Sequence, residues 1–174
     1  MNLEPVHARS ISLSVRDGMT SIAMNSVKAA QSAHSFIFTD REVRSTGNPL
    51  THTILRGFVD RYGQSIPNYH YEDLKKVAEL YAQGNYENPA IVVDCNHSNS
   101  GKQYEEQIRI AKEVLQSARY AEEIRTLVKG LMIESYIEDG NQSQDGGVYG
   151  KSITDPCLGW EKTERLIFDL ADTL

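Results

Sequence analysis

The feature that most restricts the fold of this chain is an alternation of short apolar runs with longer segments of helical periodicity. Apolar runs rich in β-branched and aromatic residues predict strands at 34–39, 51–57, 89–97 and 130–137. Apolar residues at three- and four-residue spacing predict helices at 17–33, 71–84, 102–120 and 159–174. Strands separated by helices are joined by βαβ crossovers, so the pattern predicts a parallel sheet in an α/β fold.

The stretch "HSFIFTDREVRSTGNPL" is expected to form a hairpin, at about residues 36–46, that leads into the strand "THTILRG". No linker, charge block or low-complexity tract divides the chain, so residues 1–174 are expected to form one domain with a hydrophobic core. Two parallel architectures fit this order of elements. One is an open doubly wound sheet, and the other is part of a (β/α)8 barrel.

Three of the predicted strands end at a charged or ligand-type side chain. "ILRG" ends with Arg56, "VVDCNH" with His97 and "LMIES" with Glu134. The carboxyl ends of parallel strands form one face of a sheet, so these side chains are predicted to face one pocket. Each alone has a purely structural explanation, such as a hydrogen-bonded histidine or an arginine paired with a carboxylate. Their coincidence on three consecutive strands favours a functional site.

The chemistry of these three side chains is complementary. A neutral imidazole and a carboxylate both bind divalent first-row metals, and a guanidinium binds a carboxylate or phosphate through two parallel hydrogen bonds. A metal beside such an anion site suits a small phosphorylated substrate with a carbonyl group to polarise.

Composition argues against several other classes of partner. The formal net charge of −6 provides no excess of positive charge for binding nucleic acid or an anionic membrane. The chain contains no apolar run long enough to span a bilayer, and "MNLEPVHARS" lacks the apolar core of a secretion signal. Cys95 and Cys157 have neither metal-knuckle spacing nor a disulfide framework. A cytoplasmic location is therefore expected.

Four motifs carry a resemblance to a known family. "DCNHSNSGKQ", "LMIESYIEDGNQ", "YGKSITDPCLGWE" and "ILRG" with "PNY" resemble the class I DAHP synthases (3-deoxy-D-arabino-heptulosonate-7-phosphate synthases) of the shikimate pathway. The resemblance is dense from Thr46 to Leu174, looser from Asp17 to Asp40, and poor over 1–16. It implies a (β/α)8 barrel that condenses phosphoenolpyruvate with erythrose 4-phosphate. It also implies a divalent metal (Mn, Fe, Co or Zn) held by a Cys, a His, a Glu and an Asp.

The resemblance assigns roles to individual positions. His97 and Glu134 match the family's metal histidine and glutamate, and Asp155 in "SITDPCLGWE" matches its metal aspartate, on the loop after the last strand. Arg56 matches an arginine that binds the phosphoenolpyruvate phosphate. Cys157 is interpreted as a packing residue, because the family's metal cysteine lies in the first strand. No residue is assigned a catalytic proton transfer.

The chain also departs from the family pattern. It is about half as long as a family member and is expected to provide strands five to eight with their helices, plus an inserted β-hairpin. The metal cysteine, the "KPRT" loop and the "GAR" arginine belong to the other half, so metal binding is expected to be weakened. The family's fifth-strand lysine falls on Leu13 without a gap, or on Arg9 with one.

Half of a barrel leaves two strand edges unpaired and one wall of the sheet uncovered. The chain is therefore expected to self-associate, to pair with a complementing N-terminal half, or to flatten into an open sheet. Three functions follow as hypotheses. The first is a DAHP synthase half that is inactive alone, the second is a non-catalytic metal- and phosphometabolite-binding or regulatory half-barrel, and the third is an interaction protein or the relic of a truncated gene.

Overall fold

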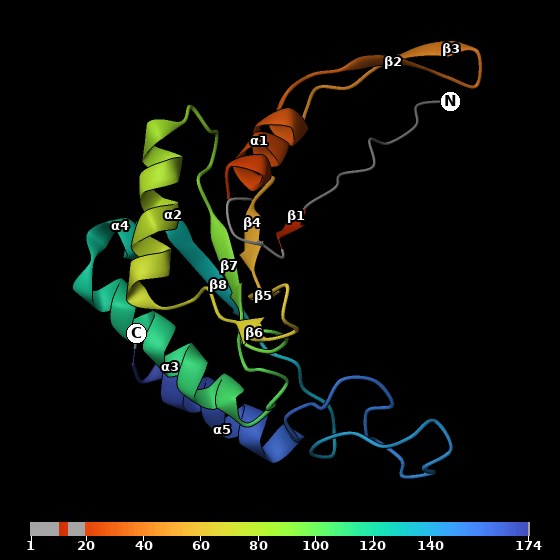
Figure 1. Ribbon diagram of the computed structural model, residues 1–174, viewed down its shortest axis with the longest axis vertical. Helices are drawn as coiled ribbons and strands as arrows, with labels where there is room; N and C mark the ends of the chain where they lie inside the picture. Colours follow the sequence, from red (N-terminus) through yellow and green to blue (C-terminus); the bar gives the residue numbers. More distant parts are fainter. Residues whose placement is uncertain (1–10, 14–19, 174) are drawn as a thin grey trace.

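The computed structural model describes residues 11–13 and 20–173, and its centre is a parallel sheet. The strands pair in the order β1-β4-β7-β8, with every neighbouring pair parallel (Figure 1). Their bounds are β1 Ile11–Leu13, β4 Thr53–Leu55, β7 Ile91–Asp94 and β8 Val128–Met132. The predicted α/β fold with a parallel sheet is confirmed.

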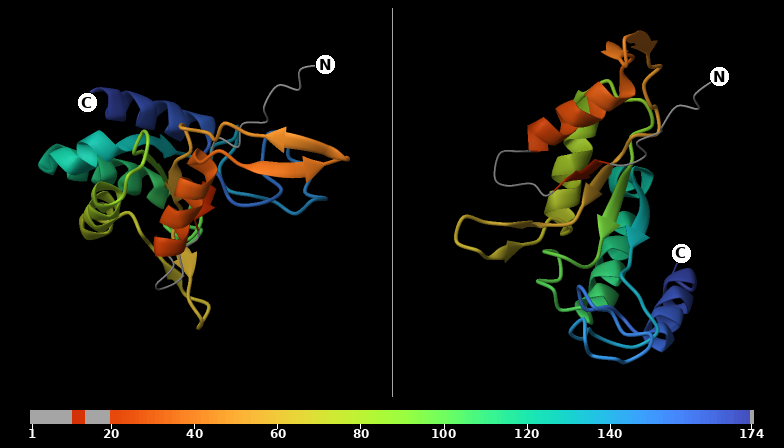
Figure 2. Two further views of the ribbon diagram at one scale, coloured as in Figure 1. Left: turned by 90° about the horizontal axis from the view of Figure 1, so that it is seen from above. Right: turned by 90° about the vertical axis from the view of Figure 1, so that its right-hand side faces the viewer.

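Helices connect each parallel pair of strands. Helix α1 lies between β1 and β4 in the chain, α2 between β4 and β7, and α3 and α4 between β7 and β8, while α5 follows the last strand. The bounds are α1 Thr20–Gln31, α2 Tyr71–Gln83, α3 Glu106–Tyr120, α4 Glu122–Leu127 and α5 Trp160–Ala171. Helices α2, α3 and α4 lie on the same side of the sheet (Figures 1 and 2).

The hydrophobic core fills the layer between the sheet and these helices. Leu55, Ile91 and Val93 of the sheet pack with Leu74 of α2 and Ile110 of α3, among other buried residues. Side chains alternate between the two faces of a strand, so the residues between them point away from this layer. On β8 the exposed side chains include Met132, which is 38% exposed. The second face of the sheet is therefore less completely covered than the first.

The predicted hairpin is also present. Strands β2 (Ser35–Phe38) and β3 (Arg41–Arg44) pair in antiparallel register and extend away from the body of the protein (Figure 2). The two residues that join them, Thr39 and Asp40, both have positive φ, which is typical of a type I′ turn. A second hairpin, β5 (Phe58–Val59) with β6 (Ser65–Ile66), lies between β4 and α2.

Several predicted elements were wrong in their bounds; the strand expected at 89–97, for example, ends at Asp94, before His97. The strand expected at 130–137 ends at Met132, because the backbone of Glu134 bonds to the side chain of Gln107 rather than to a neighbouring strand. The helix expected at 102–120 begins at Glu106, because Lys102 has a left-handed backbone and closes a turn with His97. In the described residues, no helix has the length and apolar character needed to cross a membrane.

Candidate metal centre

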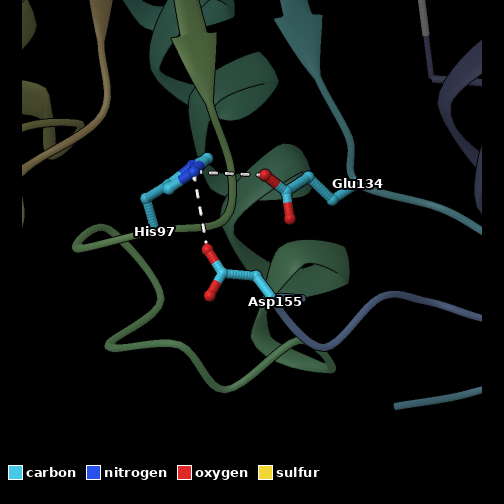
Figure 3. Close-up of side chains that lie close together, drawn as sticks. All are labelled: His97, Glu134 and Asp155. Carbon is cyan, nitrogen blue, oxygen red and sulfur yellow. Dashed lines mark ion pairs between the residues drawn. The ribbon is translucent and has the colours of Figure 1, made fainter. Parts of the chain in front are cut away.

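Three side chains from separate segments meet at the carboxyl edge of the sheet. His97 lies in the turn after β7, Glu134 follows β8, and Asp155 lies in the long loop before α5 (Figure 3). One ligand atom from each lies within 4.8 Å of the others. His97 Nε2 is 3.2 Å from Glu134 Oε1 and 3.8 Å from Asp155 Oδ2.

The ring of His97 is oriented by the last residue of β7. Asp94 is buried, and its Oδ2 lies 2.8 Å from His97 Nδ1. A carboxylate only accepts hydrogen bonds, so this contact orients the ring of His97 through Nδ1, and Nε2 is the ring atom that faces Glu134 and Asp155. His97 also has a positive φ of 49°, an uncommon conformation for a residue with a side chain. A carboxylate–histidine pair of this kind is typical of metal sites.

Glu134 is held through both its backbone and its side chain. The buried Gln107 of α3 donates to the backbone oxygen of Glu134 at 3.1 Å and accepts from its backbone N–H at 2.8 Å. Asn96 donates to Oε2 of the Glu134 carboxylate at 2.7 Å. Oε1 is then the oxygen that faces His97.

The two carboxylate oxygens of Asp155 face different neighbours. Its Oδ2 faces His97, whereas its Oδ1 lies 3.3 Å from the ammonium group of Lys102. Ser152 donates to the backbone oxygen of Asp155 at 2.8 Å, which ties down the loop that carries it.

A divalent metal fits this arrangement of donors. Two carboxylates and one imidazole nitrogen converge at this site. Among the described residues, the one lysine or arginine that forms an ion pair with these carboxylates is the exposed Lys102. Such a concentration of negative charge is stabilised by a cation, and N and O donors suit first-row metals. Three protein ligands leave a position open for water or substrate.

Arg56 shares a cavity with part of this cluster. The cavity has a volume of about 410 Å³ and is lined by Arg56, Gly57, Phe58, Val59, His97, Ser98, Lys102 and Asp155. Glu134 does not line this cavity, but its carboxylate contacts His97, which does. Among the described residues, no hydrogen bond or ion pair engages the Arg56 side chain. Arg9, the alternative cation, lies outside the described residues.

Gly57 allows the end of β4 to approach the turn that carries His97. It has a φ of +69°, and a Cβ atom there would lie 2.8 Å from the backbone of both Ser98 and Asn99. Asn99 donates to the backbone oxygens of Leu55 and Asp94, and so joins the ends of β4 and β7. These contacts place Arg56 beside His97.

Neither cysteine belongs to the cluster. Burial, with a smaller contribution from the charge of Asp94, raises the pKa of the Cys95 thiol to about 12. Burial also raises the pKa of Cys157, whose thiol contacts the backbone oxygen of Asp155. The thiolate is the form that binds metals, so both environments disfavour ligation.

Sequence reasoning missed several residues that support the site, namely Asp94, Asn96, Asn99, Lys102 and Gln107. Asp94 carried a signal, because a carboxylate three residues before a candidate ligand histidine can orient its ring. Gln107 carried none, since nothing in a helical sequence predicts a bond to a backbone 27 residues away.

Comparison with known proteins extends these observations. Residues 3–167 match the model of the DAHP synthetase I family. The chain is 37% identical over 167 residues to the Trp-sensitive phospho-2-dehydro-3-deoxyheptonate aldolase of Escherichia coli O6:H1, with 91% of this chain and 45% of the relative covered. It is 35% identical over 167 residues to the phospho-2-dehydro-3-deoxyheptonate aldolase of Haemophilus influenzae, covering 91% and 43%.

A solved structure agrees. The phospho-2-dehydro-3-deoxyheptonate aldolase of Francisella tularensis SCHU S4 superimposes with a TM-score of 0.71 and 29% identity, over 87% of this chain and 44% of that one. The chain thus spans under half the length of the relatives that it matches.

Fold and cluster together define a parallel α/β protein with a candidate divalent-metal site at the carboxyl edge of its sheet. With a family model matched over residues 3–167, the chain belongs to the DAHP synthetase I family.

Proposed function

We propose that residues 1–174 form one domain, the C-terminal half of a (β/α)8 barrel, and that it condenses phosphoenolpyruvate with erythrose 4-phosphate once a complementary half completes it. The observation that carries this proposal is the convergence of His97, Glu134 and Asp155 beside the cavity of Arg56. Membership of the family supports this reaction. The chain matches less than half of the length of its relative, which supports the idea that a second half-barrel must complete it.

The metal would be Mn, Fe, Co or Zn, held by His97, Glu134 and Asp155. When bound, it supplies a Lewis acid that polarises the aldehyde of erythrose 4-phosphate. Asp94 orients the ring of His97 so that Nε2 faces the other two ligands, while Asn96 and Gln107 fix Glu134. Without the family's cysteine ligand, binding is expected to be weaker than at a four-ligand site.

Arg56 has a different task in this proposal. Its guanidinium binds the phosphate of phosphoenolpyruvate through paired charge-assisted hydrogen bonds, and so positions the substrate without transferring a proton. The close approach that Gly57 permits keeps this group beside the metal ligands.

The chain alone is expected to form no DAHP above background from phosphoenolpyruvate and erythrose 4-phosphate with Mn²⁺. The physical reason is the absence of several phosphate-binding cations, each of which can contribute about 100-fold or more to the rate. A coupled assay for released phosphate measures this. Robust turnover by the 174-residue chain would contradict the proposal and make Arg9 the first residue to test.

The second candidate function is a non-catalytic binder of metal and phosphometabolites that regulates a complete synthase. Leu13 at the position of the family's lysine favours it, because the chain would then bind a substrate phosphate without the second substrate contact. Binding of phosphoenolpyruvate that persists without any turnover, even after a complementary half is added, would select this function.

Partner contacts are expected on the sheet. In the described part of the chain, β1 and β8 are the outer strands of the parallel sheet, and unpaired strand edges favour association. Purified chain should therefore behave as a dimer or larger species in multi-angle light scattering. A stable monomer would contradict this and favour an open, self-sufficient sheet.

A further inference from the structure

Lys102 is a charged residue of the cavity to which the proposed function gives no role. The turn from His97 to Lys102 is closed by a backbone hydrogen bond of 2.9 Å from Lys102 N–H to the oxygen of His97. Lys102 itself has a φ of +63°, so its backbone is held in an uncommon conformation. This turn brings the lysine to the rim of the same cavity that Arg56 lines.

The cavity thus contains two cations and one carboxylate. Lys102 pairs with Oδ1 of Asp155 at 3.3 Å, whereas the Arg56 side chain has no hydrogen-bonding or ionic partner among the described residues. Two cations facing one small cavity are favoured when an anion lies between them. Among the described residues, the anion paired with Lys102 is Asp155, whose other oxygen faces His97.

We propose that Lys102 is the second cation of the anion site of Arg56, and that Asp155 withholds it until a metal occupies the neighbouring cluster. The inference rests on the proposed function for the chemistry of its ligand, a phosphate ester. A metal bound by Asp155 neutralises the carboxylate, and the ammonium group then turns to the phosphate. Metal and phosphate would consequently strengthen each other's binding, since coupling between two sites is reciprocal.

Because Lys102 is exposed, exchanging its ion-pair partner costs little free energy. Its side chain is 66% exposed, and ion pairs at this exposure contribute little to stability. The long, flexible side chain can therefore change partners without disturbing the fold. A phosphate dianion, unlike the carboxylate of Asp155, would engage both cations at once.

A double-mutant cycle in metal-free protein tests this inference without activity. Inorganic phosphate is titrated in the presence of a chelator, and binding is followed by NMR chemical shifts. The change Asp155→Asn keeps the shape of the side chain but releases Lys102. We expect it to tighten phosphate binding about fivefold or more when Lys102 is present, and less than about twofold in the Lys102→Met background.

Lys129→Met is the matched control. It removes the same charge from β8, and Lys129 lines a different cavity near Glu123 and Thr126. In this background the effect of Asp155→Asn should be undiminished. An equal gain with and without Lys102 would overturn the inference, because Asp155 would then repel phosphate by itself. Failure of every variant to bind phosphate would overturn it as well.

Failure of the proposed metal site has a separate signature. If wild-type protein does not bind Mn²⁺ but the phosphate cycle shows coupling through Lys102, the metal-ligand proposal and the release of Lys102 by metal both fail, whereas the two-cation site stands. If Mn²⁺ binds and the cycle shows no coupling, the two-cation site fails and the metal proposal stands.

Discussion

Replacing His97 by alanine is expected to weaken the binding of Mn²⁺ by at least about tenfold, on the scale seen when the coordination of a metal site is disturbed. His97 provides the one nitrogen donor of the cluster, and Glu134 and Asp155 are left as two carboxylates. Isothermal titration calorimetry with Mn²⁺ or Co²⁺ measures the loss. Asp94→Asn should cause a loss of the same kind, because it replaces the carboxylate that orients the His97 ring with a neutral amide.

His52→Ala is the control for this experiment. His52 is a histidine outside the cluster whose ring bonds to the backbone oxygen of Leu50. Its removal should leave Mn²⁺ affinity unchanged. Equal affinity in wild type and His97→Ala would contradict the metal role of the cluster.

Adding the N-terminal half of a related synthase is expected to give measurable turnover to a chain that we expect to be inactive alone. The half of the Escherichia coli relative that this chain does not match is the natural choice, because the chain covers 45% of that protein. It would pair with the edge strands of the sheet and supply the substrate-binding groups that resemblance places in that half. Product formation from both substrates with Mn²⁺ measures the effect.

The matched control for complementation is the same mixture made with His97→Ala. It should assemble equally well by light scattering and yet form at least about tenfold less product at limiting Mn²⁺. Assembly without any turnover by the wild-type mixture would contradict the enzymatic proposal and favour the regulatory one.

Local patterns predicted three of the four strands of the parallel sheet, β4, β7 and β8, but not the three-residue β1. The runs around Ile54 and Val92 are apolar with β-branched residues, and α2 and α3 carry apolar residues at helical spacing, so these elements were found from sequence alone. The short α4 was missed because its six residues hold too few turns to show a period. The end of β8 was misplaced because Gln107, distant in sequence, binds the backbone of Glu134.

The candidate site was partly predictable for the same reason. Arg56 directly follows an apolar run and His97 lies in the turn after β7, so the topology of parallel strands implied that they would be neighbours. Asp155 followed no strand and was found only through family resemblance. Its partner Lys102 is 53 residues away, and no local pattern predicts an ion pair over that separation.

Anomalous diffraction from crystals of the chain grown with Mn²⁺ is the most direct test of the central claim. The account predicts one strong peak between Nε2 of His97, Oε1 of Glu134 and Oδ2 of Asp155, the atoms that face one another in the structure. It also predicts that this peak is absent from crystals of His97→Ala. A peak elsewhere, or none at millimolar Mn²⁺, would contradict the account.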